Sequence, residues 1–133
     1  MKINTALISV YDKKNLKQLL KLLNGLKVNL ISSGGTYKKI RKLGFKCQEI
    51  SNFTGSSEIL EGRVKTLHPK IHAGILSKRN NKLHSKQLKK NKYKEIDLVV
   101  VNFYPFEETL KKTNRATRTE AKVSVSVRNL FFI

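Results

Sequence analysis

The sequence has few of the residues that build disulfide, zinc or membrane proteins. Cysteine occurs once, at Cys47, which excludes an intrachain disulfide and a zinc site made of thiolates. No apolar run approaches membrane-spanning length. The first residues, MKINTALISV, lack the apolar core and small-residue cleavage site of a secretory signal. We therefore predict a cytoplasmic protein without a membrane partner.

Acidic residues are also scarce. Nine Asp and Glu stand against 28 Lys and Arg, so the formal net charge at pH 7 is +19. Most of these cations are lysines spread through nearly every segment, whereas surfaces that recognise bases usually rely on clustered arginines. The charge therefore predicts non-specific, salt-sensitive contact with nucleic acid and no specific recognition. A codon bias that favours lysine is one hypothesis for much of this positive charge.

The remaining composition suits one globular domain, with 133 residues of which 39% are hydrophobic. Apolar runs predict strands at 5–11, 28–32, 46–50 and 96–103, with 72–76 as a further candidate. Helical spacing and end signals predict helices over 16–26 after an N-cap at Asp12, over 37–44, over 81–94 and from Pro105 to 112, with one helical turn around Glu58. Strands and helices that alternate in this way predict an α/β layer fold with a parallel sheet.

Polar loops follow three of the predicted strands, at 9–13, 32–36 and 102–105. In an open α/β sheet, ligands bind beyond the carboxyl ends of the strands. A Gly34-Gly35 turn that leads into a helix exposes backbone N–H groups and adds the helix dipole, which suits a phosphate. Such a turn alone often only connects a strand to a helix, but three polar loops at one edge predict a ligand site.

The segment 60–76 reads LEGRVKTLHPKIHAGIL and concentrates cations and histidines. Arg63 and Lys65 flank one residue, so in an extended segment they face the same side, as a clamp for a phosphate or carboxamide would require. His68 and His72 have the spacing of a metal pair, but Pro69 argues against a helix there and no third ligand is evident. We therefore expect no metal.

Simpler roles stay open for several of these side chains. Lys13 can be a solvated residue at a helix start, and Tyr104, which precedes a proline, can pack against the sheet edge. Cys47 follows a strand pattern and suits a core or edge position better than a nucleophile.

With these loops in view, the sequence resembles the amino-terminal IMP cyclohydrolase domain of the bifunctional purine-biosynthesis protein, over roughly residues 5 to 112. The resemblance rests on ALISVYDK, LISSGGT, SNFTGSSEILEGRVKTLHPKIHAGIL and DLVVVNFYPFEET, of which GRVKTLHPxIHxGIL is the most specific. It implies a methylglyoxal-synthase-like fold, a Rossmann-like three-layer sandwich with a mainly parallel sheet, for residues 1–114. It also implies a homodimer.

The resemblance further implies ring closure of 5-formamidoimidazole-4-carboxamide ribotide to inosine monophosphate, with loss of water and without a cofactor. Such a site needs a donor for the oxyanion, a proton shuttle and a grip on the phosphate. The family's motifs assign the chemistry to Lys65 and Tyr104. They assign contacts with the substrate and its phosphate to Ser9, Tyr11, Lys13, Ser33, Gly34, Gly35, Thr36, Arg63, Thr66 and Asn102, where Tyr11 replaces a serine of the family.

The segment 115–133, RATRTEAKVSVSVRNLFFI, departs from the family. The family continues with an I-D-I-G-G segment and an R-A-A-A-K-N helix, which supply an active-site Asp and Lys, and then with a formyltransferase domain; residues 115–133 contain neither motif, and we expect this chain to lack the formyltransferase domain. A frame-shifted or truncated copy is one hypothesis, and a separately encoded partner is another. Because a lost acid or base costs about 10²- to 10⁴-fold, we expect binding with poor turnover. A non-catalytic ribotide-binding module and a basic nucleic-acid-binding protein are the alternatives.

Overall fold

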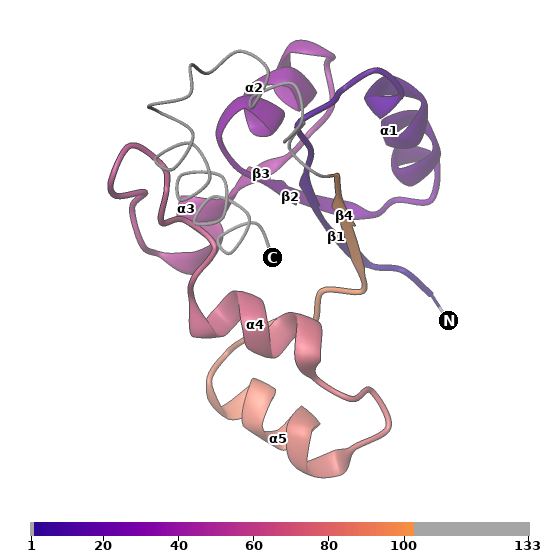
Figure 1. Cartoon of the computed structure of the whole chain (residues 1–133). Helices are drawn as coiled ribbons and strands as arrows, with labels where there is room; N and C mark the ends of the chain where they lie inside the picture. Colours follow the sequence, from indigo (N-terminus) through magenta and orange to yellow (C-terminus); the bar gives the residue numbers. More distant parts are fainter. Residues whose placement is uncertain (1, 103–133) are drawn as a thin grey trace, which may run out of the picture.

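The computed structural model describes residues 2–102; Met1 and residues 103–133 lie outside the described part. Its strands are β1 (Thr5–Ser9), β2 (Asn29–Ser32), β3 (Gln48–Glu49) and β4 (Leu98–Val101). They form a sheet in the order β3-β2-β1-β4, in which every neighbouring pair is parallel. Helices lie on both sides of this sheet (Figure 1). The predicted α/β sandwich with a parallel sheet is therefore confirmed.

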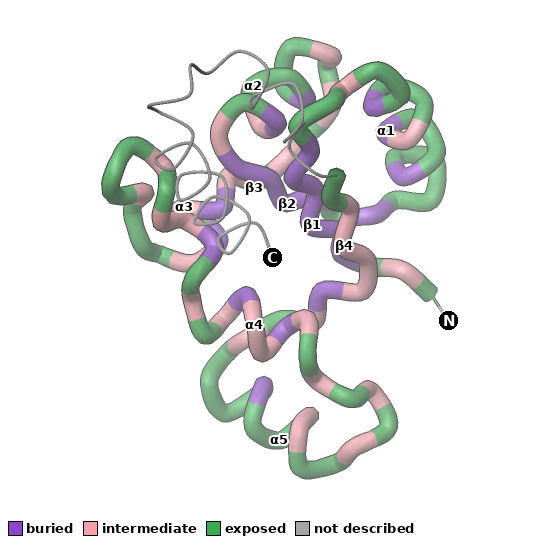
Figure 2. The backbone as a smooth tube through the Cα atoms, viewed as in Figure 1, coloured by how far each residue is buried: buried purple, intermediate pink, exposed green. Residues whose placement is uncertain are grey.

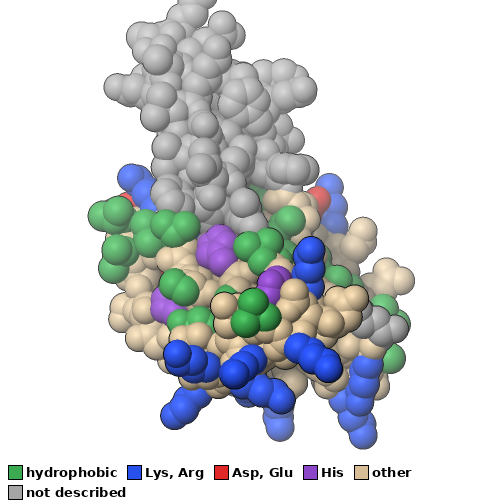
Figure 3. Space-filling model, turned by 90° about the horizontal axis from the view of Figure 1, so that it is seen from below, with side chains coloured by type: hydrophobic (Ala, Val, Ile, Leu, Met, Phe, Trp, Pro, Cys, Tyr) green, Lys and Arg blue, Asp and Glu red, His purple; other side chains and the backbone are tan. Residues whose placement is uncertain are grey.

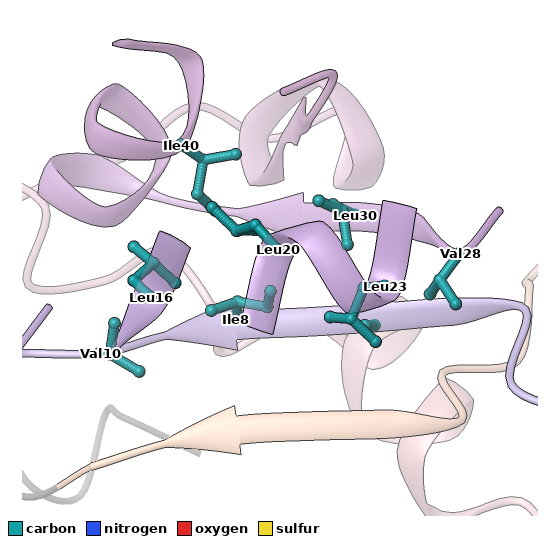
Figure 4. Packing of buried hydrophobic residues seen from close by; sticks show 9 residues of the cluster. Ile8, Val10, Leu16, Leu20, Leu23, Val28, Leu30 and Ile40 are labelled. Atoms are coloured by element: carbon teal, nitrogen blue, oxygen red, sulfur yellow. The ribbon is translucent and has the colours of Figure 1, made fainter. Parts of the chain in front are cut away.

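Two helices, α1 (Leu16–Gly25) and α2 (Gly34–Lys42), cover one face of the sheet. The leucine spacing that predicted α1 places Leu16, Leu20 and Leu23 on its buried side. These leucines pack with Ile8 of β1 and Ile40 of α2 in one cluster (Figure 4). Full burial of a side chain of this size stabilises the fold by about 1.5–3 kcal/mol.

The opposite face is covered by α3 (Ile50–Thr54) and α4 (Pro69–Leu76). Leu7 lies between Ala6 and Ile8 on β1 and points to the other side of the sheet, as strand alternation requires. The cluster on this side consists of Leu7, Ile31, Ile50, Phe53, Ile71 and Ile96. Buried segments accordingly run along the strands and into the helices on each side (Figure 2). The two clusters make the sheet the middle layer of three.

The strand predicted at 72–76 is wrong, because this segment belongs to α4. Pro69 occupies the first helical position, where its missing N–H costs nothing and its fixed φ favours the helix. His68 is the N-cap, and its Nδ1 accepts a hydrogen bond from the backbone N of Lys70 at 3.1 Å. The proline that argued against a helix therefore begins one.

The basic helix predicted over 81–94 is confirmed as α5 (Lys82–Lys90). Asn81 caps it by accepting hydrogen bonds from the backbone N of Leu83 and of His84. Helix α5 lies beyond α4, at the bottom of Figure 1 and away from α2. It therefore forms an outer element and not a layer of the sandwich.

Arg79, in the connection between α4 and α5, joins these helices to the sheet. Its Nη2 donates to the carbonyl oxygen of Ile96 at 2.8 Å and lies 3.4 Å from a carboxylate oxygen of Asp97. The other oxygen of Asp97 accepts from the backbone N of Asn4 at 2.9 Å and of Thr5 at 3.0 Å. This buried carboxylate thus fixes the start of β1 against the start of β4.

Two predictions at the amino-terminal ends of helices need correction, the start of α2 and the cap of α1. Helix α2 begins at Gly34, three residues before the predicted start, whereas α1 begins at Leu16 as predicted, with Asn15 at the N-cap position. Asp12 was predicted to cap α1, but its Oδ1 accepts from the backbone N of Lys14 at 3.0 Å instead. Short polar side chains favour such local turns as much as helix caps, which explains the difference.

The segment 46–58 also differs from prediction. Only Gln48 and Glu49 of the expected strand pair with β2, since the chain turns into α3 at Ile50. The helical turn expected around Glu58 is wrong; Glu58 lies outside every helix of the described part. The helix predicted from Pro105 and the segment 115–133 fall outside the described residues. Within residues 2–102, no helix has both the length and the apolar character needed to cross a bilayer.

Candidate anion-binding and catalytic site

Because the sheet is parallel, the loops after β1, β2 and β4 meet at one edge. Asn102, directly after β4, fastens the loop after β1 with its side-chain amide. Its Oδ1 accepts hydrogen bonds from the backbone N of Tyr11 at 2.6 Å and of Asp12 at 3.3 Å. Its Nδ2 donates to the carbonyl oxygen of Asp12 at 2.8 Å. The structure therefore brings two of the predicted polar loops into direct contact.

The loop after β2 leads into the N-terminus of α2. Ser33 precedes the helix in an extended conformation and is buried. The carbonyl oxygen of Ser33 accepts from the backbone N of Tyr37 at 3.2 Å. The N–H groups of Gly34, Gly35 and Thr36 lie in the first turn, where a helix offers them no acceptor of its own. Together with the helix dipole, this turn offers donors and partial positive charge to an anion.

The ammonium of Lys65 lies beside this turn. Its Nζ is 3.4 Å from the position that a Cβ on Gly34 would take, and 3.8 Å from the corresponding position on Gly62. Both glycines have a positive φ, +51° at Gly34 and +77° at Gly62, which other residues adopt only with strain. A Cβ at either position would lie in van der Waals contact with the ammonium. Two loops far apart in sequence thus leave room for one cation beside a helix N-terminus.

Arg63 does not share the position of Lys65. Leu60, Glu61 and Gly62 all have a positive φ, so the chain turns just before Arg63, and Val64 then pairs with Ile59 in an antiparallel bridge. The Arg63 guanidinium lies 3.8 Å from the Glu61 carboxylate, and its side chain is 58% exposed. Of the two predicted cations, Lys65 is the one beside α2.

The other predicted ligands surround the same edge. Lys13 is partly exposed, and its Nζ donates to the carbonyl oxygen of Tyr11 at 2.8 Å. Ser9 is buried at the end of β1, opposite Val101 in the parallel register, and Thr66 is buried next to Lys65. Tyr104 lies outside the described residues.

The comparisons with known proteins identify the family and the fold. The family model of the MGS-like domain matches residues 15–127. The chain belongs to the MGS-like domain family. The crystal structure of ForH superimposes on 76% of this chain and 51% of its own with a TM-score of 0.70, at 32% sequence identity. The predicted family and fold are therefore confirmed.

The similar curated sequences are proteins named bifunctional purine biosynthesis protein PurH. This chain is 54% identical to PurH of Clostridium kluyveri over 104 residues, which cover 78% of this chain and 21% of the relative. It is 48% identical to PurH of Acetivibrio thermocellus over 112 residues, which cover 84% of this chain and 22% of the relative. The MGS-like chain described here therefore spans about a fifth of the length of these relatives.

Thr36 joins the β1 loop of this MGS-like domain to α2. Its hydroxyl donates to the carbonyl oxygen of Val10 at 2.9 Å and accepts from the backbone N of Val10 at 3.2 Å, and all of these atoms are buried. Replacing Thr36 by Val keeps the shape but leaves two buried backbone groups unpaired. We expect a loss of about 1–3 kcal/mol in the free energy of unfolding, measured with urea. Thr36→Ser keeps the hydroxyl, so a Ser variant as unstable as the Val variant would contradict this role.

Cys47 is a half-buried residue packed against the core cluster of α1 and α2, in line with its predicted structural place. Burial raises the pKa of the Cys47 thiol from 9.0 to about 11, while Arg41 opposes this shift. At pH 8 the folded protein then has about a hundredfold less thiolate than the unfolded chain, so iodoacetamide should alkylate Cys47 correspondingly more slowly without urea than with it. Because the pKa is raised on folding, this thiol's contribution to stability is complete below pH 9 and lost as the pH rises to 11. Equal alkylation rates with and without urea would contradict the burial.

A separate hollow of about 350 Å³ lies between α4 and α5. Its lining residues are Ala73, Leu76, Ser77, His84, Gln87, Leu88, Asn91 and Tyr93. Figure 3 views the underside of the molecule, where histidines lie among hydrophobic side chains and Lys and Arg project around them. None of the predicted ligand residues lines this hollow, so we place the anion site at the edge of the sheet and not here.

Metal ligands do not gather in the part of the chain that the structure describes. Among residues 2–102, no three His, Cys, Asp or Glu side chains come together as a metal site would need. The Nδ1 of His68 already accepts the hydrogen bond from Lys70. The predicted residues at the sheet edge offer amide, hydroxyl and ammonium donors, which suit an anion better than a cation.

The sequence interpretation missed Glu58. Its carboxylate has one oxygen, Oε1, that is buried without a hydrogen-bond partner among the described residues. The signal that was available is its place in the motif segment, seven residues before Lys65, in a chain with only nine acidic residues. Glu58 therefore joins Lys65 and Gly62 as a component of the site region.

Proposed function

We propose that the chain is an IMP cyclohydrolase, which closes 5-formamidoimidazole-4-carboxamide ribotide to inosine monophosphate. The observation that carries the proposal is the position of the Lys65 ammonium beside the first turn of α2. The name of the PurH relatives supports purine biosynthesis, and ring closure is our inference for this chain.

The reaction forms a bond between the carboxamide nitrogen and the formyl carbon. One proton from the carboxamide nitrogen and one from the formamido nitrogen leave with the formyl oxygen as water. We assign the ribotide phosphate to the N–H groups of Gly34, Gly35 and Thr36, since a helix N-terminus favours an anion. We assign to Lys65 the donation of a hydrogen bond and a proton to the formyl oxygen as negative charge develops there.

Further parts of the proposal rest on the family resemblance alone. Tyr104 is the second proposed catalytic residue. Ser9, Tyr11, Lys13, Ser33, Arg63, Thr66 and Asn102 are proposed to complete the contacts with the ribotide. The homodimer and the cytoplasmic location stay predictions. A purine ribotide is the proposed partner, because its phosphate suits the amides of α2 and the cation beside them.

The test is the absorbance change of the formamido ribotide with the purified 133-residue chain. A rate clearly above the enzyme-free background supports the proposal. If no rate is observed but inosine monophosphate binds saturably in calorimetry, the proposed enzymatic activity is overturned and a non-catalytic ribotide-binding module is favoured. Neither rate nor binding would overturn both. Sequence-specific binding of DNA or RNA that resists salt would instead favour a nucleic-acid-binding protein.

A further inference from the structure

The loop that carries Lys65 also brings Glu58 opposite it. Ile59 and Val64 form an antiparallel bridge, with hydrogen bonds of 3.1 Å and 3.3 Å between their backbones. In antiparallel pairing, the residues just outside a bridged pair face each other. For this bridge they are Glu58 and Lys65. The turn over Leu60–Arg63 therefore closes a small hairpin with one acid and one base at its open end.

The side chains of Glu58 and Lys65 converge on the space that Gly62 leaves empty. A Cβ on Gly62 would lie 3.0 Å from Oε2 of Glu58 and 3.8 Å from Nζ of Lys65. The same ammonium lies next to Gly34, at the start of α2. Because Gly62 has no side chain, the Glu58 carboxylate can approach the Lys65 ammonium, the cation that we assign to catalysis.

Burial gives this approach an energetic reason. Oε1 of Glu58 is buried and accepts no hydrogen bond within residues 2–102. A buried carboxylate is costly unless a nearby positive charge compensates it. The other acid of the loop, Glu61, is 88% exposed and lies near Arg63, so its charge is screened by solvent. The loop therefore has an outer ion pair in solvent, whereas the Glu58 carboxylate and the Lys65 ammonium both lie beside Gly62 at the site.

We propose that Glu58 is a positioning residue for Lys65. Its carboxylate draws the Lys65 ammonium into the space over Gly62 and keeps the ammonium beside Gly34, where it can donate to the ligand. The effect of Glu58 on turnover rests on the proposed function. The electrostatic pairing of Glu58 with Lys65 does not depend on that function.

The pairing is tested by chemical labelling of the full chain. Acetic anhydride acylates neutral amines, and mass spectrometry resolves the rate at each lysine. In Glu58→Gln the shape is kept but the charge that holds the Lys65 amine over Gly62 is lost, so the amine should be more accessible and its acylation at pH 8 should rise roughly three- to tenfold over the wild type. The matched control Glu61→Gln removes the exposed acid of the same loop and should leave the Lys65 rate unchanged. Lys21, on α1, serves as the internal reference.

Two further variants separate charge from shape. Glu58→Asp keeps the charge, so it should keep Lys65 acylation closer to the wild-type rate than Glu58→Gln does. Gly62→Ala places a methyl group between the Glu58 carboxylate and the Lys65 ammonium, so it should raise acylation of Lys65 as Glu58→Gln does. A Lys65 rate that is the same in Glu58→Gln and Glu61→Gln overturns the proposal.

The positioning role is tested by kinetics with the formamido ribotide. We expect kcat to fall about tenfold in Glu58→Gln, with a smaller change in KM, because the ammonium acts on the reacting oxygen. Glu61→Gln should keep both constants. An unchanged kcat in Glu58→Gln overturns the positioning role even if labelling changes. Absence of turnover in the wild type instead counts against the proposed function, and labelling then still decides the pairing.

Discussion

Replacing Lys65 by Met should lower kcat for closure of the formamido ribotide by about 10²- to 10⁴-fold, the usual effect of removing a general acid or base. The substitution keeps a long apolar side chain in the space between Gly34 and Gly62 but removes the ammonium. The amides of α2 remain, so binding of inosine monophosphate should weaken much less than turnover. Initial rates over a range of ribotide concentrations, with calorimetry of the product, measure the two effects separately.

The matched control is Lys21→Met, which removes the same charge from an exposed position on α1. Its kcat should equal that of the wild type, because charges that are screened by solvent and distant from the site contribute little. Far-UV circular dichroism checks that both variants are folded. If the Lys65 variant keeps more than about a tenth of the wild-type kcat, Lys65 is not a catalytic residue.

The parts of the fold that could be predicted are those in which burial alone shapes the sequence. Apolar runs marked β1, β2 and β4; β1 is buried along its whole length, as in a strand covered on both faces, whereas β4 is only partly buried. The spacing of leucines marked α1. Once the strands were known to be parallel, the meeting of their polar carboxyl ends followed from geometry. The ligand site at the carboxyl edge of the sheet could therefore be predicted without any measured distance.

The start of α4 could not be predicted by the same reasoning. Proline breaks a helix from inside but stabilises one at its first position, and the sequence does not fix which of these positions Pro69 takes. The choice depends on Ile71, whose side chain must reach the second core cluster. A helix that begins at Pro69 places it there. Tertiary packing thus decided between two readings that were equal locally.

The position of Lys65 depends on contacts that no local pattern contains. Its segment is separated by some thirty residues from Gly34, and the turn with three successive positive φ values, at Leu60, Glu61 and Gly62, redirects the chain just before Arg63. Leu60 and Glu61 are unusual residues for that conformation, so turn chemistry gave no signal. Asn102 is similar, because its amide bonds to Tyr11 and Asp12 appear only when β4 lies beside β1. The sequence shows that Lys65 and Asn102 are present, but it does not show which groups they contact in the fold.

Replacing Gly74 by Ala should reduce the free energy of unfolding by about 2 kcal/mol, although alanine is the better helix former. Gly74 lies in α4, and its carbonyl oxygen accepts a hydrogen bond from the backbone N of Ile96 at 3.0 Å. A Cβ there would lie 2.7 Å from the carbonyl oxygen of Lys94 and within 3.3 Å of the Ile96 side chain. The obstructing atom belongs to the backbone, so the whole segment that leads into β4 must move. Urea unfolding followed by circular dichroism measures the change.

Gly25→Ala is the matched control, because it makes the same substitution at the end of α1 where a Cβ meets nothing within 4 Å. Its backbone conformation does not require glycine, so alanine should stabilise the protein by about 0.4–1 kcal/mol through the unfolded chain. The two variants therefore shift the urea midpoint in opposite directions. Since the movement forced at Gly74 also displaces Ile96 from the second core cluster, its effect should exceed that of any exposed glycine. A Gly74 variant as stable as the wild type would mean that α4 does not pack on the segment before β4 as described.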